Sequence, residues 1–170
     1  MDRRRILVLS LVLALIGAVT PAHAAVEPAW GWPVVVPVIR AFDPPSDPYG
    51  AWHRGIDIAA AVGSPVLAPV AGRVTFAGKV GGQLYVTLDH GGGLVSTYSW
   101  ISAALVSKND VVAAGATVAL SGLGHPGSVV AHLHLGVKRD GAYIDPLELL
   151  GSPNLVGLIH LAPLLPTGFV

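Results

Sequence analysis

The sequence predicts an all-β fold in which antiparallel sheets form a compact, sandwich-like or barrel-like domain. Two observations support this prediction. Short segments rich in Val, Leu and Thr follow one another at close spacing, and no long segment after the first 24 residues has helical periodicity. Consecutive short strands bury their apolar faces when sheets stack or close on themselves, which gives a sandwich or a barrel.

The individual strands are placed by their alternation and by the glycines between them. Glycine permits turn conformations that other residues disfavour, so we expect breaks at Gly78 and over residues 122–127. The run Gly91-Gly92-Gly93 predicts a hairpin turn, and Asp140-Gly141 predicts another. The expected strands are 65–67, 72–77, 84–88, 94–99, 117–120, 129–137 and 143–144.

The first 24 residues have the three parts of a secretory signal peptide. Met1 to Arg5 is basic, residues 6–19 form an apolar run, and Ala22-His23-Ala24 fits the small-x-small cleavage pattern. An uncleaved anchor is the alternative, but the run of 14 residues is shorter than the ~17 to 25 that a membrane-spanning helix needs. We therefore expect a secreted protein. Its only expected contact with the membrane is through the leader, before the leader is cleaved.

The 146 residues that follow the leader suit one domain. We expect that domain over residues 25–150 and an apolar tail, 151–170, that packs onto it. Seven basic and nine acidic residues remain outside the leader, which gives a net charge of −2 and no basic patch for a nucleic-acid partner. The chain has no Cys, so its stability must come from packing and from any bound metal. The sequence does not indicate an oligomeric state.

Two histidine-containing patterns indicate a metal site. In Ala131-His132-Leu133-His134-Leu135-Gly136, an extended strand places His132 and His134 on one face, about 6 to 7 Å apart, with the two leucines toward the core. A second pattern, His53-Arg54-Gly55-Ile56-Asp57, offers an imidazole and a carboxylate. A single His is more often a hydrogen-bonded surface or core residue, so either pattern alone is weak. Together they favour one shared metal site.

The order of these patterns resembles the M23 family of zinc metallopeptidases that cleave peptidoglycan, of the lysostaphin and LytM type. Between the early His-x3-Asp and the late His-x-His stands Gly63-Ser64-Pro65-Val66-Leu67-Ala68-Pro69-Val70-Ala71-Gly72-Arg73-Val74. Further matches are His90-Gly91-Gly92-Gly93, the run 111–118 around Gly115, and residues 141–147. The resemblance covers roughly residues 30–150, and the order of the motifs is more specific than any one of them.

The resemblance implies roles for four residues. His53, Asp57 and His134 would be the three protein ligands of Zn²⁺, with a fourth position open to water. His132 would lie beside the metal as the catalytic residue that donates to the scissile carbonyl oxygen or transfers a proton. The implied substrate is the peptide part of peptidoglycan. The implied location is extracytoplasmic, in association with the cell wall.

The chain departs from the family pattern at Trp100. Family members usually carry a further catalytic His in a Tyr-x-His-Leu segment, and the corresponding run here is Tyr98-Ser99-Trp100-Ile101. Indole can donate a hydrogen bond but cannot exchange a proton near neutral pH. His125, in the glycine-rich loop before the His-x-His strand, is the nearest candidate in the sequence to replace that His.

Three functions stay open at this stage. The first is a secreted zinc endopeptidase, favoured because every implied metal ligand is retained. The second is a non-catalytic module that binds the cell wall or activates a hydrolase, favoured by Trp100. The third is a lipoyl-type or biotinyl-type carrier domain, which needs a Lys displayed in a tight turn, a condition that Lys79 and Lys108 do not meet convincingly.

The signal-peptide prediction can be tested directly. We expect the secreted protein to begin at Ala25, because cleavage follows the small residue at position 24. N-terminal sequencing of protein recovered outside the cytoplasm measures this. A retained Met1 on membrane-associated protein would favour the anchor instead.

Overall fold

The computed structural model of the protein describes residues 30–35, 37–44 and 52–151. Within these residues, ten β-strands join antiparallel into one sheet, accompanied by a short 3-10 helix, η1 (Pro146–Glu148). The predicted all-β, antiparallel fold is confirmed. No helix in this part of the chain has the length and apolar character needed to cross a membrane.

Seven strands lie where the sequence predicts them, and three short ones do not follow from the sequence pattern. The unexpected strands, β1, β2 and β7, have two to four residues. The bounds are β1 (Val38–Arg40), β2 (Ile56–Ala59), β3 (Pro65–Leu67), β4 (Gly72–Val80), β5 (Gln83–Gly91), β6 (Leu94–Ala104), β7 (Val111–Val112), β8 (Thr117–Ser121), β9 (His132–Arg139) and β10 (Ala142–Ile144).

Several predicted strand boundaries are wrong. β5 continues to Gly91 and β6 to Ala104, beyond the predicted ends at Leu88 and Ser99. Gly78 does not end a strand but lies inside β4, where it pairs with Tyr85 and the Phe76 ring lies against it. β9 begins at His132 and not at Val129. The Val129 side chain is fully exposed, so no burial favours a strand there, and Ser128 Oγ donates to the Val130 carbonyl at 2.8 Å within a turn.

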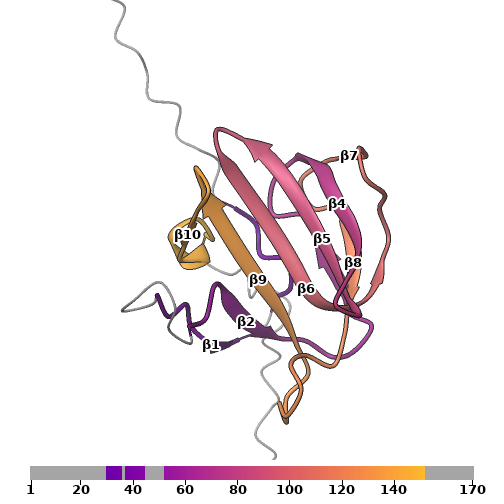
Figure 1. Cartoon of the computed structure of the whole chain (residues 1–170), viewed down its shortest axis with the longest axis vertical. Helices are drawn as coiled ribbons and strands as arrows, with labels where there is room; N and C mark the ends of the chain where they lie inside the picture. Colours follow the sequence, from indigo (N-terminus) through magenta and orange to yellow (C-terminus); the bar gives the residue numbers. More distant parts are fainter. Residues whose placement is uncertain (1–29, 36, 45–51, 152–170) are drawn as a thin grey trace, which may run out of the picture.

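Strand β9 is the element on which the other strands near the site are aligned. Along one edge it pairs with β6, and along the other it pairs first with β2 and then with β10. Figure 1 shows β9 beside the long strands β6, β5 and β4, with β2 and β10 on its other side. In this register Asp57 of β2 lies directly opposite His134.

Strand β6 changes partner in its middle, and Trp100 occupies the point of change. Ser99 is the last residue of β6 paired with β9, and Ile101 is the first paired with β8. On the β5 side, Leu84 and Tyr85 pair with Ile101 and Ser99, so Trp100 is an extra residue between two pairs. Its φ of 60° is rare for a residue with a side chain. Trp100 therefore forms a β-bulge, a feature that redirects a side chain.

The core lies on the face of the sheet opposite the histidines. Leu133, Leu135 and Val137 of β9 are fully buried, as are Ile56 and Ile58 of β2. Each such aliphatic side chain stabilises the fold by about 1.5–3 kcal/mol on burial. The predicted alternation of β9, with leucines inward and histidines on the other face, is confirmed.

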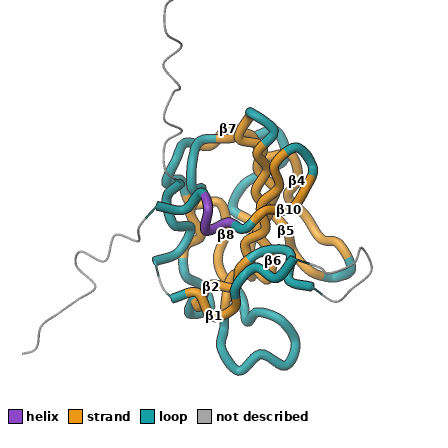
Figure 2. The backbone as a smooth tube through the Cα atoms, turned by 90° about the vertical axis from the view of Figure 1, so that its left-hand side faces the viewer, coloured by secondary structure: helices purple, strands orange, loops and turns teal. Residues whose placement is uncertain are grey.

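The loop from residue 122 to residue 131 leaves the body of the sheet before β9. It is the orange loop at the bottom of Figure 1, and Figure 2 shows it extending beyond β1 and β2. The predicted signal peptide and nearly all of the apolar tail, from residue 152 onward, lie outside the described residues. Their predicted processing and packing stay predictions.

A single glycine sets how closely β2 approaches β9. A Cβ at Gly55 would overlap the carbonyl group of Leu135, which is backbone and cannot move aside alone. We expect Gly55→Ala to lower the free energy of unfolding by about 1–3 kcal/mol, the usual cost of overpacking, measured by urea denaturation. Gly78→Ala is the control, because its Cβ would meet only the flexible Phe76 ring. Equal unfolding midpoints for the two variants would contradict this account.

Candidate metal centre

The β2–β9 pair and the residues just before β2 bring the predicted metal ligands together. Asp57 and His134 are opposite partners in that pair. His53 precedes β2 and is held by two backbone hydrogen bonds with Asp43, each 3.1 Å long. The structure thus places His53, Asp57 and His134 in one cluster, and their role as ligands stays a prediction.

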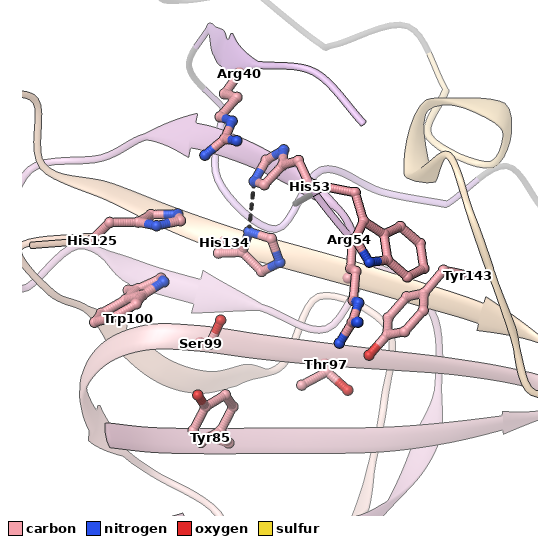
Figure 3. A pocket seen from close by; sticks show the side chains of 12 residues that line it. Arg40, His53, Arg54, Tyr85, Thr97, Ser99, Trp100, His125, His134 and Tyr143 are labelled. Carbon is pink, nitrogen blue, oxygen red and sulfur yellow. Dashed lines mark hydrogen bonds between the residues drawn. The ribbon is translucent and has the colours of Figure 1, made fainter. Parts of the chain in front are cut away.

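Three donor atoms form a nearly equilateral triangle. Asp57 Oδ1 is 3.0 Å from His53 Nε2 and 2.8 Å from His134 Nδ1, and the two nitrogens are 3.0 Å apart. Figure 3 shows one nitrogen of each ring directed at the other along this last contact. Ligands about 2.0–2.1 Å from a tetrahedral metal are about 3.3 Å apart, so a small adjustment would fit the triangle to Zn²⁺. The residues present therefore suit that ion.

The outer nitrogen of His53 fixes which nitrogen faces the cluster. Nδ1 of His53 lies 2.7 Å from the carbonyl oxygen of Ala41, to which it donates its hydrogen. In the neutral ring the lone pair is then on Nε2, which points at Asp57 and His134. A backbone carbonyl behind the imidazole is the usual way in which proteins orient a metal-binding histidine.

The electrostatic setting favours the deprotonated forms of the cluster. Burial alone would raise the pKa of Asp57, but the hydrogen bond from His134 and the attraction of the His53 and His134 rings hold it well below its usual value. Burial lowers the pKa of His134, although its interactions with Asp57 oppose that shift. An ionised carboxylate and a neutral imidazole are the forms that bind a metal.

His132 lies beside this cluster but beneath a loop. Its Nε2 is 3.9 Å from Asp57 Oδ2, yet the residue is only 2% exposed. Nδ1 donates to the Val130 carbonyl at 2.8 Å, and Nε2 accepts the backbone N–H of His125 at 3.2 Å. Both ring nitrogens are thus engaged within residues 125–132. Its catalytic role stays a prediction.

His125 is the further imidazole at the cluster. Its Nε2 is 3.2 Å from Asp57 Oδ2 and 3.3 Å from Oδ1. One ligand atom from each of His53, Asp57, His125 and His134 lies within 4.8 Å of all the others. The His125 ring stacks on Trp100, with 5.1 Å between the ring centres and 23° between the planes. The sequence suggests His125 only through its place before the His-x-His strand.

A pocket of about 580 Å³ opens over the cluster. Two arginines lie on different sides of it (Figure 3), and the Arg54 guanidinium stacks 4.4 Å above the Trp52 ring. The sequence patterns do not single out these cations. The lining residues are Arg40, Trp52, His53, Arg54, Tyr85, Thr97, Ser99, Trp100, His125, His134, Gly136 and Tyr143.

Comparisons with known proteins agree with this geometry. The chain is 39% identical over 175 residues to an uncharacterized protein of Mycobacterium tuberculosis, a match covering 97% of this chain and 68% of that protein. It is 30% identical over 124 residues to the murein hydrolase activator NlpD of Salmonella typhimurium, covering 72% of this chain and 31% of the activator.

A solved structure and a family model extend the match. The crystal structure of a zinc-containing peptidase from Vibrio cholerae aligns with a TM-score of 0.62 and 26% identity, over 71% of this chain and 40% of that one. This chain thus spans less than half of the length of the Vibrio and Salmonella proteins. The model of peptidase family M23 matches residues 51–146, more than half of the 170 residues. This match shows that the chain belongs to peptidase family M23.

Proposed function

We propose that this protein is an extracytoplasmic, zinc-dependent endopeptidase that hydrolyses peptide bonds of bacterial peptidoglycan. The observation that carries the proposal is the donor triangle of His53, Asp57 and His134, whose two histidines line an open pocket. Membership of peptidase family M23 supports a hydrolase. The similarity to a zinc-containing peptidase supports the choice of metal.

His53, Asp57 and His134 would hold the ion through two nitrogens and one carboxylate oxygen. When bound, zinc lowers the pKa of a coordinated water to about 7 and polarises the peptide carbonyl. The residues supply orientation: the Ala41 carbonyl holds the His53 ring, and the β2–β9 register holds Asp57 against His134. The depressed pKa of Asp57 keeps its carboxylate ionised for that role.

His132 would handle the proton or donate to the scissile carbonyl oxygen. In the neutral ring Nδ1 carries the hydrogen that Val130 accepts, so Nε2 is the atom available for a proton. That atom accepts the backbone N–H of His125, so it becomes available only when the loop 122–131 moves away. Trp100, in place of the usual second histidine, cannot share this work.

The pocket favours a peptide that carries carboxylates, as the stems of peptidoglycan do. Arg40 and Arg54 line it, and all of the salt bridges among the described residues involve Asp57 and a histidine. Arginine binds carboxylates through paired hydrogen bonds. The stacking of Arg54 on Trp52 holds its charge over the pocket.

A second candidate function is activation of another cell-wall hydrolase without catalysis by this chain. Two observations favour it: Trp100 stands where the family usually has a histidine, and one similar protein is named a murein hydrolase activator. The retained triangle favours the peptidase. Family membership removes the carrier-domain alternative.

The metal assignment predicts that Asp57→Ala loses most of the zinc and the cleavage of peptidoglycan. Asp57 contacts both imidazoles of the triangle, so its loss removes one ligand and releases the other two. Metal analysis of the purified domain and mass analysis of fragments from digested peptidoglycan measure the two effects. Asp89→Ala, an exposed carboxylate outside the pocket, is the control. Full zinc occupancy in Asp57→Ala would show that the ligand assignment is wrong.

The proton-handling assignment predicts that His132→Ala keeps its zinc while turnover falls by roughly 10² to 10⁴, the usual contribution of a positioned acid or base. Trp100→His restores the family pattern and should raise the activity. Turnover and zinc content are measured on the same preparations. Cleavage by Trp100→His but not by the wild type would favour the activator function, and equal activity of the wild type and His132→Ala would exclude the role of His132.

A further inference from the structure

His125 is held at the cluster by two contacts that do not involve a metal. Its ring stacks on Trp100, whose side chain is directed by the bulge at the point where β6 changes partner. Its backbone N–H donates to His132 Nε2. The ring and the backbone of one loop residue are therefore both fixed by residues of the sheet.

The neighbouring glycine makes this contact possible. Gly124 has a φ of +88°, and a Cβ there would overlap the His132 ring. The loop thus passes directly over His132, and position 124 has no room for a side chain. Only glycine combines this conformation with so close an approach. The loop 122–131 is therefore fitted to the ring beneath it.

We propose that His125 is a fourth protein ligand of the metal, so that the loop 122–131 closes the site when it lies in the observed position. The inference rests on the metal site proposed above. His53, Asp57 and His134 would leave the fourth coordination position of the ion to water, and the inference concerns that position. A set of four protein ligands is typical of closed zinc sites, whereas a catalytic site keeps one position open.

The distances support a ligand at this position. His125 Nε2 is 3.2 Å from Asp57 Oδ2, close to the separations within the donor triangle. All four ligand atoms lie within 4.8 Å of one another, so the widest pair must close by about 1.5 Å to reach the spacing of about 3.3 Å in a tetrahedral site. The stack on Trp100 holds the imidazole plane in place before any ion binds.

His125 is also the ligand that can leave. Its side chain is 30% exposed, compared with 3% for those of His53 and Asp57, and it stands on a loop and not beside a strand pair. Movement of the loop would open the fourth position and free Nε2 of His132 in the same step. The reason is that the His125 ring contacts Asp57 and the His125 backbone N–H contacts His132 Nε2. Closure and catalysis would therefore exclude each other.

The test is the zinc affinity of His125→Ala, measured by competition with a chelating dye. Loss of an outer partner of a metal ligand typically lowers affinity 10–100-fold, so loss of a ligand should cost at least about tenfold. Leu123→Ala is the matched control, since this side chain of the same loop is 77% exposed and should leave affinity unchanged. His125→Gln keeps the size of the side chain and should lose affinity as His125→Ala does. Affinities within twofold of the wild type for both His125 variants would overturn the proposal.

The Co²⁺-substituted protein gives an independent readout. The wild type should show a visible spectrum that azide leaves unchanged, because four protein ligands leave no position for the anion. His125→Ala should respond to azide, because a water takes the place of the imidazole. An identical response of the two proteins to azide would contradict a fourth ligand.

Digestion of peptidoglycan separates this inference from the proposed activity. Greater cleavage by His125→Ala than by the wild type, with weaker zinc binding, supports both. Weaker zinc binding with no cleavage by either protein supports the fourth ligand and removes the peptidase function. Unchanged zinc binding removes the fourth ligand, whether or not peptidoglycan is cleaved.

Discussion

The pairing of β2 with β9 is the constraint on which the rest of the site depends. It sets Asp57 against His134, and the burial of Ile56, Ile58, Leu133 and Leu135 on the opposite face fixes the register. A slip by one residue would turn the buried side chains outward and the histidines into the core. The hydrophobic core therefore specifies the donor triangle, although its leucines and isoleucines lie on the opposite face of the sheet.

The bulge at Trp100 shows how a departure from the family pattern is absorbed by the fold. The large indole lies where the sheet divides between β9 and β8, so it is directed by a change of strand partner. There it supports an imidazole from elsewhere in the chain instead of supplying one. The site still contains a further imidazole, but this imidazole comes from the loop 122–131 and not from strand β6.

The positions of most strands could be predicted from the sequence, and the members of the donor triangle could be predicted from motifs whose order resembles the family. Alternation locates the long strands. The patterns His-x3-Asp and His-x-His contain the predicted ligands, but these side chains meet only through pairing between residues 77 and 81 positions apart. The burial of His132 and the approach of His125 to Asp57 could not be predicted. Both depend on the path of a glycine-rich loop, which has no periodicity from which its course could be predicted.

The donor triangle also determines which ions suit the site. Ca²⁺ requires six to eight oxygen ligands, and Mg²⁺ requires a near-octahedral shell of oxygens. This cluster offers imidazole nitrogens and only one carboxylate. The alkaline-earth ions that are abundant outside cells are therefore poor competitors. Affinity for nitrogen ligands rises along the first-row metals to Cu²⁺, which exceeds Zn²⁺. Copper is thus the competitor that these ligands would not exclude, and the supply of metals would then decide which ion the proposed site holds.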